Sequence, residues 1–194
     1  FQEQAAIRKG QKLTEIADTD PLTGMKNRRA IIREFSELRE DWVADDDEIG
    51  LILIDVDYFK RFNDGLGHQA GDDCLIKLAQ VLSEIAASNN AVAARYGGEE
   101  FVILCKVTGR AHLHEITQQF CRAVEDLDIY HPDRGDKLNI VTISAGASLT
   151  RADQSVELRI LLQEADRALY ASKFAGRATF TIYDPHATGP DRSG

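Results

Sequence analysis

Cysteine is scarce in this chain, and long apolar segments are absent. The three cysteines, Cys74, Cys105 and Cys121, lie in apolar stretches and show no CxxC spacing, which argues against a disulfide framework and against a zinc site. The longest apolar run, from Ile49 to Ile54, is much shorter than the roughly 20 residues of a membrane-spanning helix. We therefore expect a reducing, cytoplasmic location and no membrane contact by this fragment.

Positive charge is also in short supply. The 194 residues include 23 Lys and Arg against 32 Asp and Glu, which gives a net charge of -9 and a pI near 5.0. An acidic surface repels polyanions, so a nucleic-acid polymer is not an expected partner. A single nucleotide, held by a few local cations and a metal ion, remains compatible with this charge. The 43% hydrophobic content is typical of a folded globular domain.

Alternating helical and strand patterns predict an α+β domain. The chain begins with Phe1 rather than Met and has no signal-peptide pattern, so we expect a fragment of a longer protein. We expect a linker helix over 1–19, a domain over 20–184 and a tail over 185–194. Periodicity predicts further helices over 28–42, 75–86, 113–127 and 158–174, and strands over 50–57, 92–96, 101–107, 139–149 and 179–183. The order predicts a central mixed five-stranded sheet flanked by helices, with a ferredoxin-like core.

Four carboxylates occur at the ends of two predicted strands. Asp55 and Asp57 end an apolar strand, and Glu99 and Glu100 lie in the turn of a predicted hairpin, which we take as four residues long from Gly97. If the two ends meet, each like-charged pair at 4 Å costs about 4 kcal/mol at an effective dielectric near 20, and a cation is needed. Mg²⁺ prefers such oxygen ligands. The alternative is a solvated acidic turn.

Backbone amides and three cations suggest an anion site. Tyr58, Phe59 and Lys60 follow the strand and begin a short helix, whose first N–H groups point beyond the sheet edge. Lys173 and Arg177 are spaced i, i+4 and share one helix face if the last helix continues that far. Alternatively, Lys60 is merely solvated, and the other two cations only favour a helix C-terminus.

A glycine-rich segment, residues 63–73, is predicted to be a loop. Asn63 and Asp72 lie near its two ends, and together they match the hydrogen-bonding edge of guanine, with the carboxylate accepting from its N–H groups. Alternatively, Asp72 caps the following helix, and both roles can coexist. His68 is expected to be a structural hydrogen-bonding residue. The sequence contains no P-loop and no recognisable hydrolase triad.

Five separated blocks, taken together, resemble the GGDEF family of diguanylate cyclases over about residues 20–184. They are DPLTGMKNRR at 20–29, DVDYFKRFNDGLGHQAGDD at 55–73, RYGGEEF at 95–101, TISAGA at 142–147 and ADRALYASKFAGR at 165–177. The resemblance implies a palm-like nucleotidyl cyclase fold, GTP as substrate, and Mg²⁺ as cofactor, for which Mn²⁺ can substitute. The implied products are cyclic di-GMP and pyrophosphate.

The resemblance also implies roles for individual residues. Metal ligands would be Asp55, the carbonyl of Val56 and Glu99, and catalytic residues would be Glu99, Asp55 and Lys60. Substrate would be bound by Tyr58, Phe59, Lys60, Asn63, Asp72, Gly97, Gly98, Lys173 and Arg177. Asn63 and Asp72 would hold guanine, and the glycines of the hairpin would allow close backbone approach. Glu100 is a further candidate, and Glu99 occupies the position where the family signature has Asp.

One departure from the family pattern concerns feedback. Many members carry an RxxD motif nine residues ahead of the signature, at an inhibitory product site. Here that segment is Ser88-Asn89-Asn90-Ala91, so weak product inhibition is expected.

The leading interpretation is an active cyclase that works as a homodimer, because one domain binds one GTP and ring closure needs two. An upstream sensory domain would control it through the linker helix, and the fragment would be cytoplasmic, alone or as part of a membrane-anchored sensor. A catalytically silent GTP-binding module is the alternative. An ATP-using cyclase is disfavoured by Asp72, which suits the donors of guanine.

Overall fold

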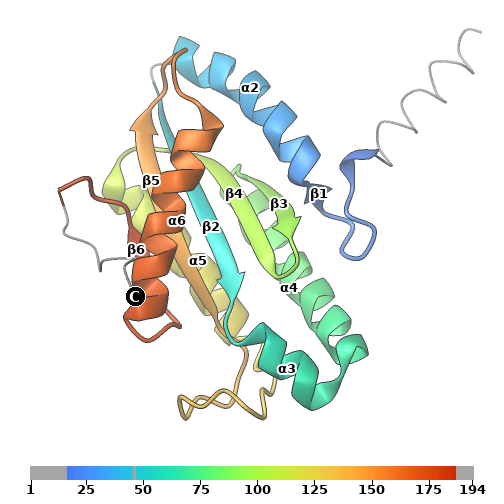
Figure 1. The fold of residues 1–194 in the computed structure, drawn as a ribbon. Helices are drawn as coiled ribbons and strands as arrows, with labels where there is room; N and C mark the ends of the chain where they lie inside the picture. The colour runs from blue at the N-terminus through green and yellow to red at the C-terminus, as the bar shows by residue number, and fades with distance from the viewer. Residues whose placement is uncertain (1–16, 46, 187–194) are drawn as a thin grey trace, which may run out of the picture.

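A mixed six-stranded sheet with five helices packed around it makes up residues 17–45 and 47–186, the part of the chain that the computed structural model describes (Figure 1). The strands are β1 Lys26–Asn27, β2 Glu48–Val56, β3 Val92–Gly97, β4 Glu100–Val107, β5 Ile143–Arg151 and β6 Phe180–Ile182. The helices are α2 Arg28–Ala44, α3 Phe59–Leu66, α4 His68–Ser88, α5 Arg110–Glu125 and α6 Leu158–Phe174. None of the described helices is long and apolar enough to cross a bilayer.

The strand order is β1-β3-β4-β2-β5-β6, with β2 antiparallel to both of its neighbours. The α+β class is as predicted, but the expected five strands are one too few. The additional strand, β1, has only two residues, which pair with Ala94 and Arg95 of β3. Two residues are too short for an alternation pattern, so the strand left no signal in the sequence. The predicted linker helix over 1–19 lies mostly outside the described residues.

Alternation along β2 divides the core between the two faces of the sheet. Leu51 and Leu53 pack with α2 and α6, whereas Ile52 and Ile54 pack with α3, α4 and α5. Figure 1 shows α2 and α6 on the near face and α4 and α5 behind the sheet. Because side chains alternate along a strand, Asp55 falls on the face covered by α2 and α6.

The predicted loop over residues 63–73 is helical instead. The chain passes from α3 into α4 at Gly67, whose positive φ of 90° makes the turn between the two helices. Asp72 lies one turn inside α4, so the expectation that it caps this helix is wrong. Gly71 is required by packing, because a Cβ there would collide with the Oδ1 of Asn63. The glycine content predicted a loop, but Gly67 forms the junction between two helices and Gly71 allows a close contact with Asn63.

Further boundaries also differ from the expected ones. The predicted strand over 139–149 begins at Ile143, because the preceding residues leave the sheet and form only an isolated bridge between Tyr130 and Ile140. The hairpin turn has two residues rather than four, since Gly97 pairs with Glu100 after a register shift in β3. The helix predicted over 28–42 extends to Ala44, and its N-cap is confirmed because Asn27 accepts a hydrogen bond from Ala30 N at 3.0 Å.

Candidate active site

The tip of the β3–β4 hairpin lies beside the end of β2. The backbone N–H of Val56 donates to the carbonyl of Glu99 at 3.3 Å, and Asp55 is paired with Glu100 across the strands. The acidic residues at 55, 99 and 100 therefore meet at one end of the sheet, as the sequence predicts. Glu100 also lines a cleft of about 470 Å³ under α2 and α6, which leaves this side of the cluster open.

Lys173 provides the cation nearest to these carboxylates. Its Nζ lies 3.0 Å from Asp55 Oδ1, and the Asp55 side chain is 13% exposed. Burial raises the pKa of Asp55, and the nearby Glu99 raises it further, while Lys173 opposes the rise. The pKa of Glu100 is also raised, by burial and then by the charge of Asp55. One ammonium thus does not offset the negative charge that gathers here.

Asp57 has a different role from its neighbour at 55. The side chain is buried, and it accepts hydrogen bonds from Thr142 Oγ1 at 2.7 Å and Ser144 Oγ at 2.6 Å. The backbone N–H of Ala178 donates to it at 3.0 Å. Asp57 therefore ties β5 and the segment after α6 to the end of β2. The expectation that it joins the acidic cluster as a further free carboxylate is wrong, because its oxygens are already engaged.

A hard divalent cation suits the donors at this end of the sheet. Asp55, Glu99 and the Val56 carbonyl would supply its oxygen ligands, and the negative charge here exceeds the single positive charge of Lys173. Within residues 17–45 and 47–186, no three or more His, Cys, Asp or Glu side chains form a ready metal cage. Water molecules or phosphate oxygens would have to complete the coordination, as is usual for Mg²⁺ bound with a nucleotide.

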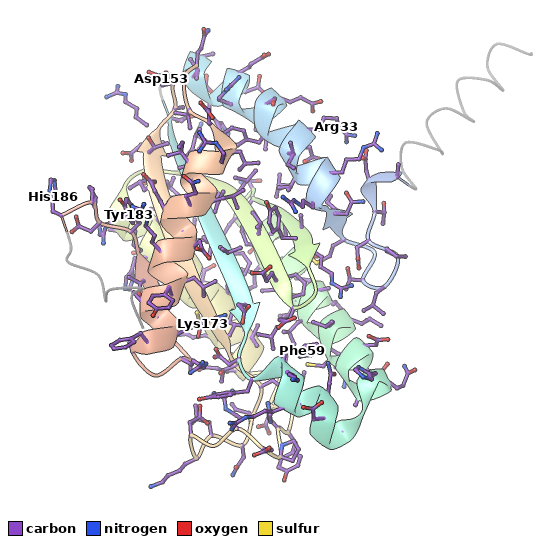
Figure 2. The ribbon with its side chains drawn as sticks, in the orientation of Figure 1. Arg33, Phe59, Asp153, Lys173, Tyr183 and His186 are labelled. Atoms are coloured by element: carbon purple, nitrogen blue, oxygen red, sulfur yellow. The ribbon has the colours of Figure 1, made fainter. Side chains whose placement is uncertain are left out.

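The anion site predicted at the start of α3 lies at the same end of the sheet. Figure 2 shows Phe59 at the start of α3 and Lys173 on α6, both at this end. Phe59 and Phe62 are buried and anchor α3 in the core, whereas Lys60 is exposed and free to reach a ligand. The first-turn N–H groups of α3 have no partner within the helix, so they can bind an anion.

Arg177 does not share a helix face with Lys173, contrary to the i, i+4 expectation. The last helix ends at Phe174, and Arg177 lies in a turn with a φ of 66°. From there its Nη1 donates to the hydroxyl of Tyr58 at 3.5 Å, and its guanidinium lies 4.6 Å from the centre of that ring. The two cations therefore approach the site separately, one beside Asp55 and the other beside Tyr58.

The two predicted guanine-binding residues lie on neighbouring helices. Asn63 is half-buried on α3 and packs against Gly71 of α4, the residue that precedes Asp72. Its Oδ1 is buried and has no hydrogen-bond partner among the described residues, and the carboxylate of Asp72 is exposed. An unpaired buried amide oxygen is unfavourable, so a ligand with polar N–H groups fits this position.

Arg95 braces the hairpin tip, a role that sequence reasoning missed. Its Nε and Nη2 donate to the carbonyl of Gly98 at 2.9 and 2.7 Å, and its Nη1 donates to the carboxylate of Asp20. Burial raises the pKa of Asp20, but hydrogen bonds from Thr23 and Arg95 outweigh burial and lower it. Asp20 and Arg95 lie in two of the five sequence blocks quoted above, at 20–29 and 95–101, but only the structure shows that the two side chains pair.

His131 and Arg134 form a second supporting group that the sequence did not indicate. His131 is buried, and its Nε2 donates to the carbonyl of Tyr58 at 3.2 Å, while its Nδ1 accepts from Asp133 N–H at 3.3 Å. Because Nδ1 accepts, the imidazole is neutral here. Burial lowers the pKa of His131, which agrees with this assignment. The loop that carries both residues thereby fixes the backbone at the start of α3.

The sequence matches the family described as "Diguanylate cyclase, GGDEF domain" over residues 17–179. The response regulator PleD of Caulobacter vibrioides is 35% identical over 164 residues, which are 84% of this chain and 35% of that protein. Diguanylate cyclase A of Treponema denticola is 32% identical over 180 residues, which are 91% of this chain and 47% of that protein.

Among solved structures, the coiled coil and GGDEF domain of DgcB from Caulobacter crescentus, in complex with c-di-GMP, has a TM-score of 0.79. It is 28% identical and covers 93% of both chains. The chain spans about a third to a half of the two curated relatives. Because the family match includes most of its residues, the chain belongs to the GGDEF family, whose members include diguanylate cyclases that typically use a divalent metal.

Proposed function

We propose that the domain is a diguanylate cyclase, which condenses two GTP into cyclic di-GMP and two pyrophosphates. The observation that carries the proposal is the meeting of Asp55 and the Glu99 turn beside the open first turn of α3. Carboxylates for a metal and amides for phosphate thereby occur side by side. That combination is the one that metal-assisted phosphoryl transfer needs.

The chain's own residues would bind and orient the nucleotide. Tyr58 and Phe59 N–H, with Lys60, Lys173 and Arg177, would hold the triphosphate, and Asp55, Glu99 and the Val56 carbonyl would hold Mg²⁺ or Mn²⁺. Once bound, the metal supplies polarisation of the α-phosphate and lowers the pKa of the attacking ribose 3'-hydroxyl. Glu99 or water would accept the proton of that hydroxyl, with Glu100 a further carboxylate at the same edge.

Guanine selection is proposed to rest on Asn63 and Asp72. The carboxylate of Asp72 is exposed, and it can accept from the two N–H positions of guanine, which adenine does not offer in the same arrangement. The unpaired Oδ1 of Asn63 would gain a hydrogen bond on binding. Gly97 and Gly98, which carry no side chain, let the hairpin backbone approach the nucleotide.

Two domains are needed for one product. Each domain would hold one GTP and present its 3'-hydroxyl to the α-phosphate of the other, so the working form is a homodimer with two-fold symmetry. An upstream sensory domain would set the proximity of two domains through the linker segment over residues 1–19. The rate should therefore rise faster than linearly with protein concentration.

Weak product inhibition is part of the proposal. The segment 88–91, which aligns with the RxxD motif, has no charged side chain, and Asn89 Nδ2 donates to Gln119 Oε1 at 2.9 Å. A neutral pair there offers little attraction to the phosphates of the product.

The deciding experiment is incubation of purified protein with GTP and Mg²⁺, followed by chromatography of the nucleotides. Formation of cyclic di-GMP, and its loss in Glu99→Ala with an unchanged circular dichroism spectrum, is expected. Untouched GTP at high protein concentration, together with measurable GTP binding, would favour the silent signalling module. Retained turnover in Glu99→Ala would remove Glu99 from the mechanism.

A further inference from the structure

The ring of Tyr58 is surrounded by three guanidinium groups. The Cζ atoms of Arg61, Arg134 and Arg177 lie 5.4, 5.3 and 4.6 Å from its centroid. They come from α3, from the loop before β5 and from the turn after α6. An aromatic face attracts a cation, but three cations around a single ring also repel one another.

Only one of the three guanidiniums is neutralised within the described residues. Arg134 is fully buried and forms a two-point pair with Asp136, at 2.9 and 2.7 Å. Arg61 donates to the backbone carbonyl of Arg134 at 3.3 Å, and Arg177 donates to the Tyr58 hydroxyl. Neither Arg61 nor Arg177 has an ion pair with a carboxylate in residues 17–45 and 47–186. Two uncompensated guanidiniums beside one ring indicate an anion as the missing partner.

The backbone that carries this group is held in unusual conformations. Tyr58, Arg177 and Ala178 all have positive φ, at 54°, 66° and 48°. Such conformations are unfavourable for residues with a side chain, and they persist where the surroundings enforce them, which is common at ligand sites. Here His131 holds the carbonyl of Tyr58, and Asp57 holds the N–H of Ala178.

We propose that the ring of Tyr58 assembles Arg61 and Arg177 into a two-guanidinium subsite for the outer phosphates of a nucleoside triphosphate. The new elements are Arg61 as a phosphate ligand and Tyr58 as the positioning residue for both guanidiniums. The inference rests on the proposed function for the identity of the nucleotide. The subsite lies past Val56, the last residue of β2 that pairs with β5. Asp55, which would face the reacting α-phosphate together with Lys173 of α6, lies within the strand.

Planar guanidiniums suit this role better than ammonium groups. Arg presents two donors to one phosphate and stacks on an aromatic face at the same time, which Lys does not do. Replacing Arg61 by Lys therefore keeps the charge but removes both properties. Replacing Tyr58 by Phe keeps the ring and removes only the hydroxyl bonded to Arg177.

The test is calorimetric titration of the protein with inorganic tripolyphosphate, with a non-hydrolysable GTP analogue and with GMP. Arg61→Gln should weaken the first two by about tenfold or more, since a charge-assisted hydrogen bond is lost, and leave GMP binding unchanged. Tyr58→Leu should give the same pattern, Tyr58→Phe a smaller loss, and Arg61→Lys an intermediate one. Arg122→Gln, an equal charge change on the exposed side of α5, is the matched control.

Equal affinities for tripolyphosphate in Arg61→Gln and Arg122→Gln would overturn the inference, as would a parallel loss of GMP binding. Thermal melts of each variant identify a loss that comes from unfolding, and Tyr58→Phe retains the packing if Tyr58→Leu does not fold. Tripolyphosphate binding that depends on Arg61, in a protein without preference for the GTP analogue, would support the subsite and refute the proposed function. If tripolyphosphate binding does not depend on Arg61 and the protein shows no preference for the GTP analogue, the subsite and the proposed function are both refuted.

Discussion

Arg95 bonds the carboxylate of Asp20 at 3.0 Å while its other nitrogens hold the carbonyl of Gly98. This guanidinium links the turn that follows residues 1–19 to the tip of the acidic hairpin. Both side chains are largely buried, at 15% and 16% exposure. A change in the position of Asp20 would therefore alter the hydrogen bonds that hold the carbonyl of Gly98, the residue before Glu99.

Replacing Arg95 should disorder the hairpin tip more than the rest of the domain. Arg95→Gln is expected to lower the free energy of unfolding by about 1–3 kcal/mol, the usual effect of losing hydrogen bonds to a charged group. Turnover in the proposed cyclase reaction should fall further than this destabilisation explains. Urea unfolding of Arg95→Gln, Asp20→Asn and the double variant gives the coupling free energy between the two side chains. Additive losses of stability would mean that Arg95 and Asp20 act independently.

Neutralising Asp55 should stabilise the protein in the absence of metal. Burial raises the pKa of Asp55, Lys173 opposes the rise and Glu99 adds to it, so ionising Asp55 costs more free energy in the folded protein than in the unfolded chain. Asp55→Asn is expected to raise the melting temperature in EDTA and to abolish the response to Mg²⁺. In the wild type, Mg²⁺ at roughly five times its Kd should add about 1 kcal/mol of stability.

Differential scanning fluorimetry with and without Mg²⁺ measures both effects. Asp64→Asn, which removes an exposed carboxylate from α3, is the control. A Mg²⁺ response that survives in Asp55→Asn would place the cation elsewhere.

Stability should fall as the pH drops below about 6.5, because His131 is buried in its neutral form. Burial lowers its pKa from 6.5 and outweighs the hydrogen bond to the Tyr58 carbonyl, which raises it. The charge of Arg134 lowers this pKa further, and the charges of Asp133 and Asp136 oppose that effect. A base whose folded pKa is lowered contributes stability above its unfolded pKa and loses it as pH falls through the folded one. Urea titrations from pH 7.5 to 5.0 measure this slope.

His131→Gln is the matched variant, because its amide can still donate to the Tyr58 carbonyl but does not titrate. Its stability should change less over the same pH range. An equal slope in both proteins would assign the pH dependence to other groups.

Adding a methyl group at Gly71 should disturb nucleotide selection. Gly71→Ala would force the Asn63 side chain to move, since the new Cβ collides with its Oδ1. We expect weaker GTP binding and a lower preference for GTP over ATP, together with a stability loss of about 1–3 kcal/mol from overpacking. Competition titrations with the two nucleotides measure the preference. Gln69→Ala, on the exposed side of the same helix, should behave as wild type.

The strongly periodic elements of this fold were predictable from the sequence, and so was the central juxtaposition of the site. The strand predicted over 50–57 was expected to end in two carboxylates near the hairpin that carries Glu99, and the Val56 N–H does donate to the Glu99 carbonyl. The apolar run and the turn signal are both local properties. The contact between the strand end and the hairpin was predictable because elements that follow one another in the chain are usually adjacent in space.

Features that depend on two distant segments were not predictable. The i, i+4 spacing of Lys173 and Arg177 suggested one face, but the helix ends between them at Phe174. The glycines of residues 63–73 predicted a loop, although Gly71 lies in a helix, where its missing side chain leaves room for Asn63. Tyr58 resembled any aromatic residue at the start of a helix, because its arginine neighbours come from segments far apart in the chain.

The three buried thiols have a practical consequence for measuring how the two domains of the proposed dimer approach each other. Cys74, Cys105 and Cys121 lie inside the core, and burial raises the pKa of each to about 12. Thiolates are the nucleophiles that attack maleimide and methanethiosulfonate reagents, so the three native cysteines should not react during labelling. One cysteine introduced on an exposed helix could then carry a spin label or fluorophore in an otherwise unmodified chain, and report inter-domain distances during turnover.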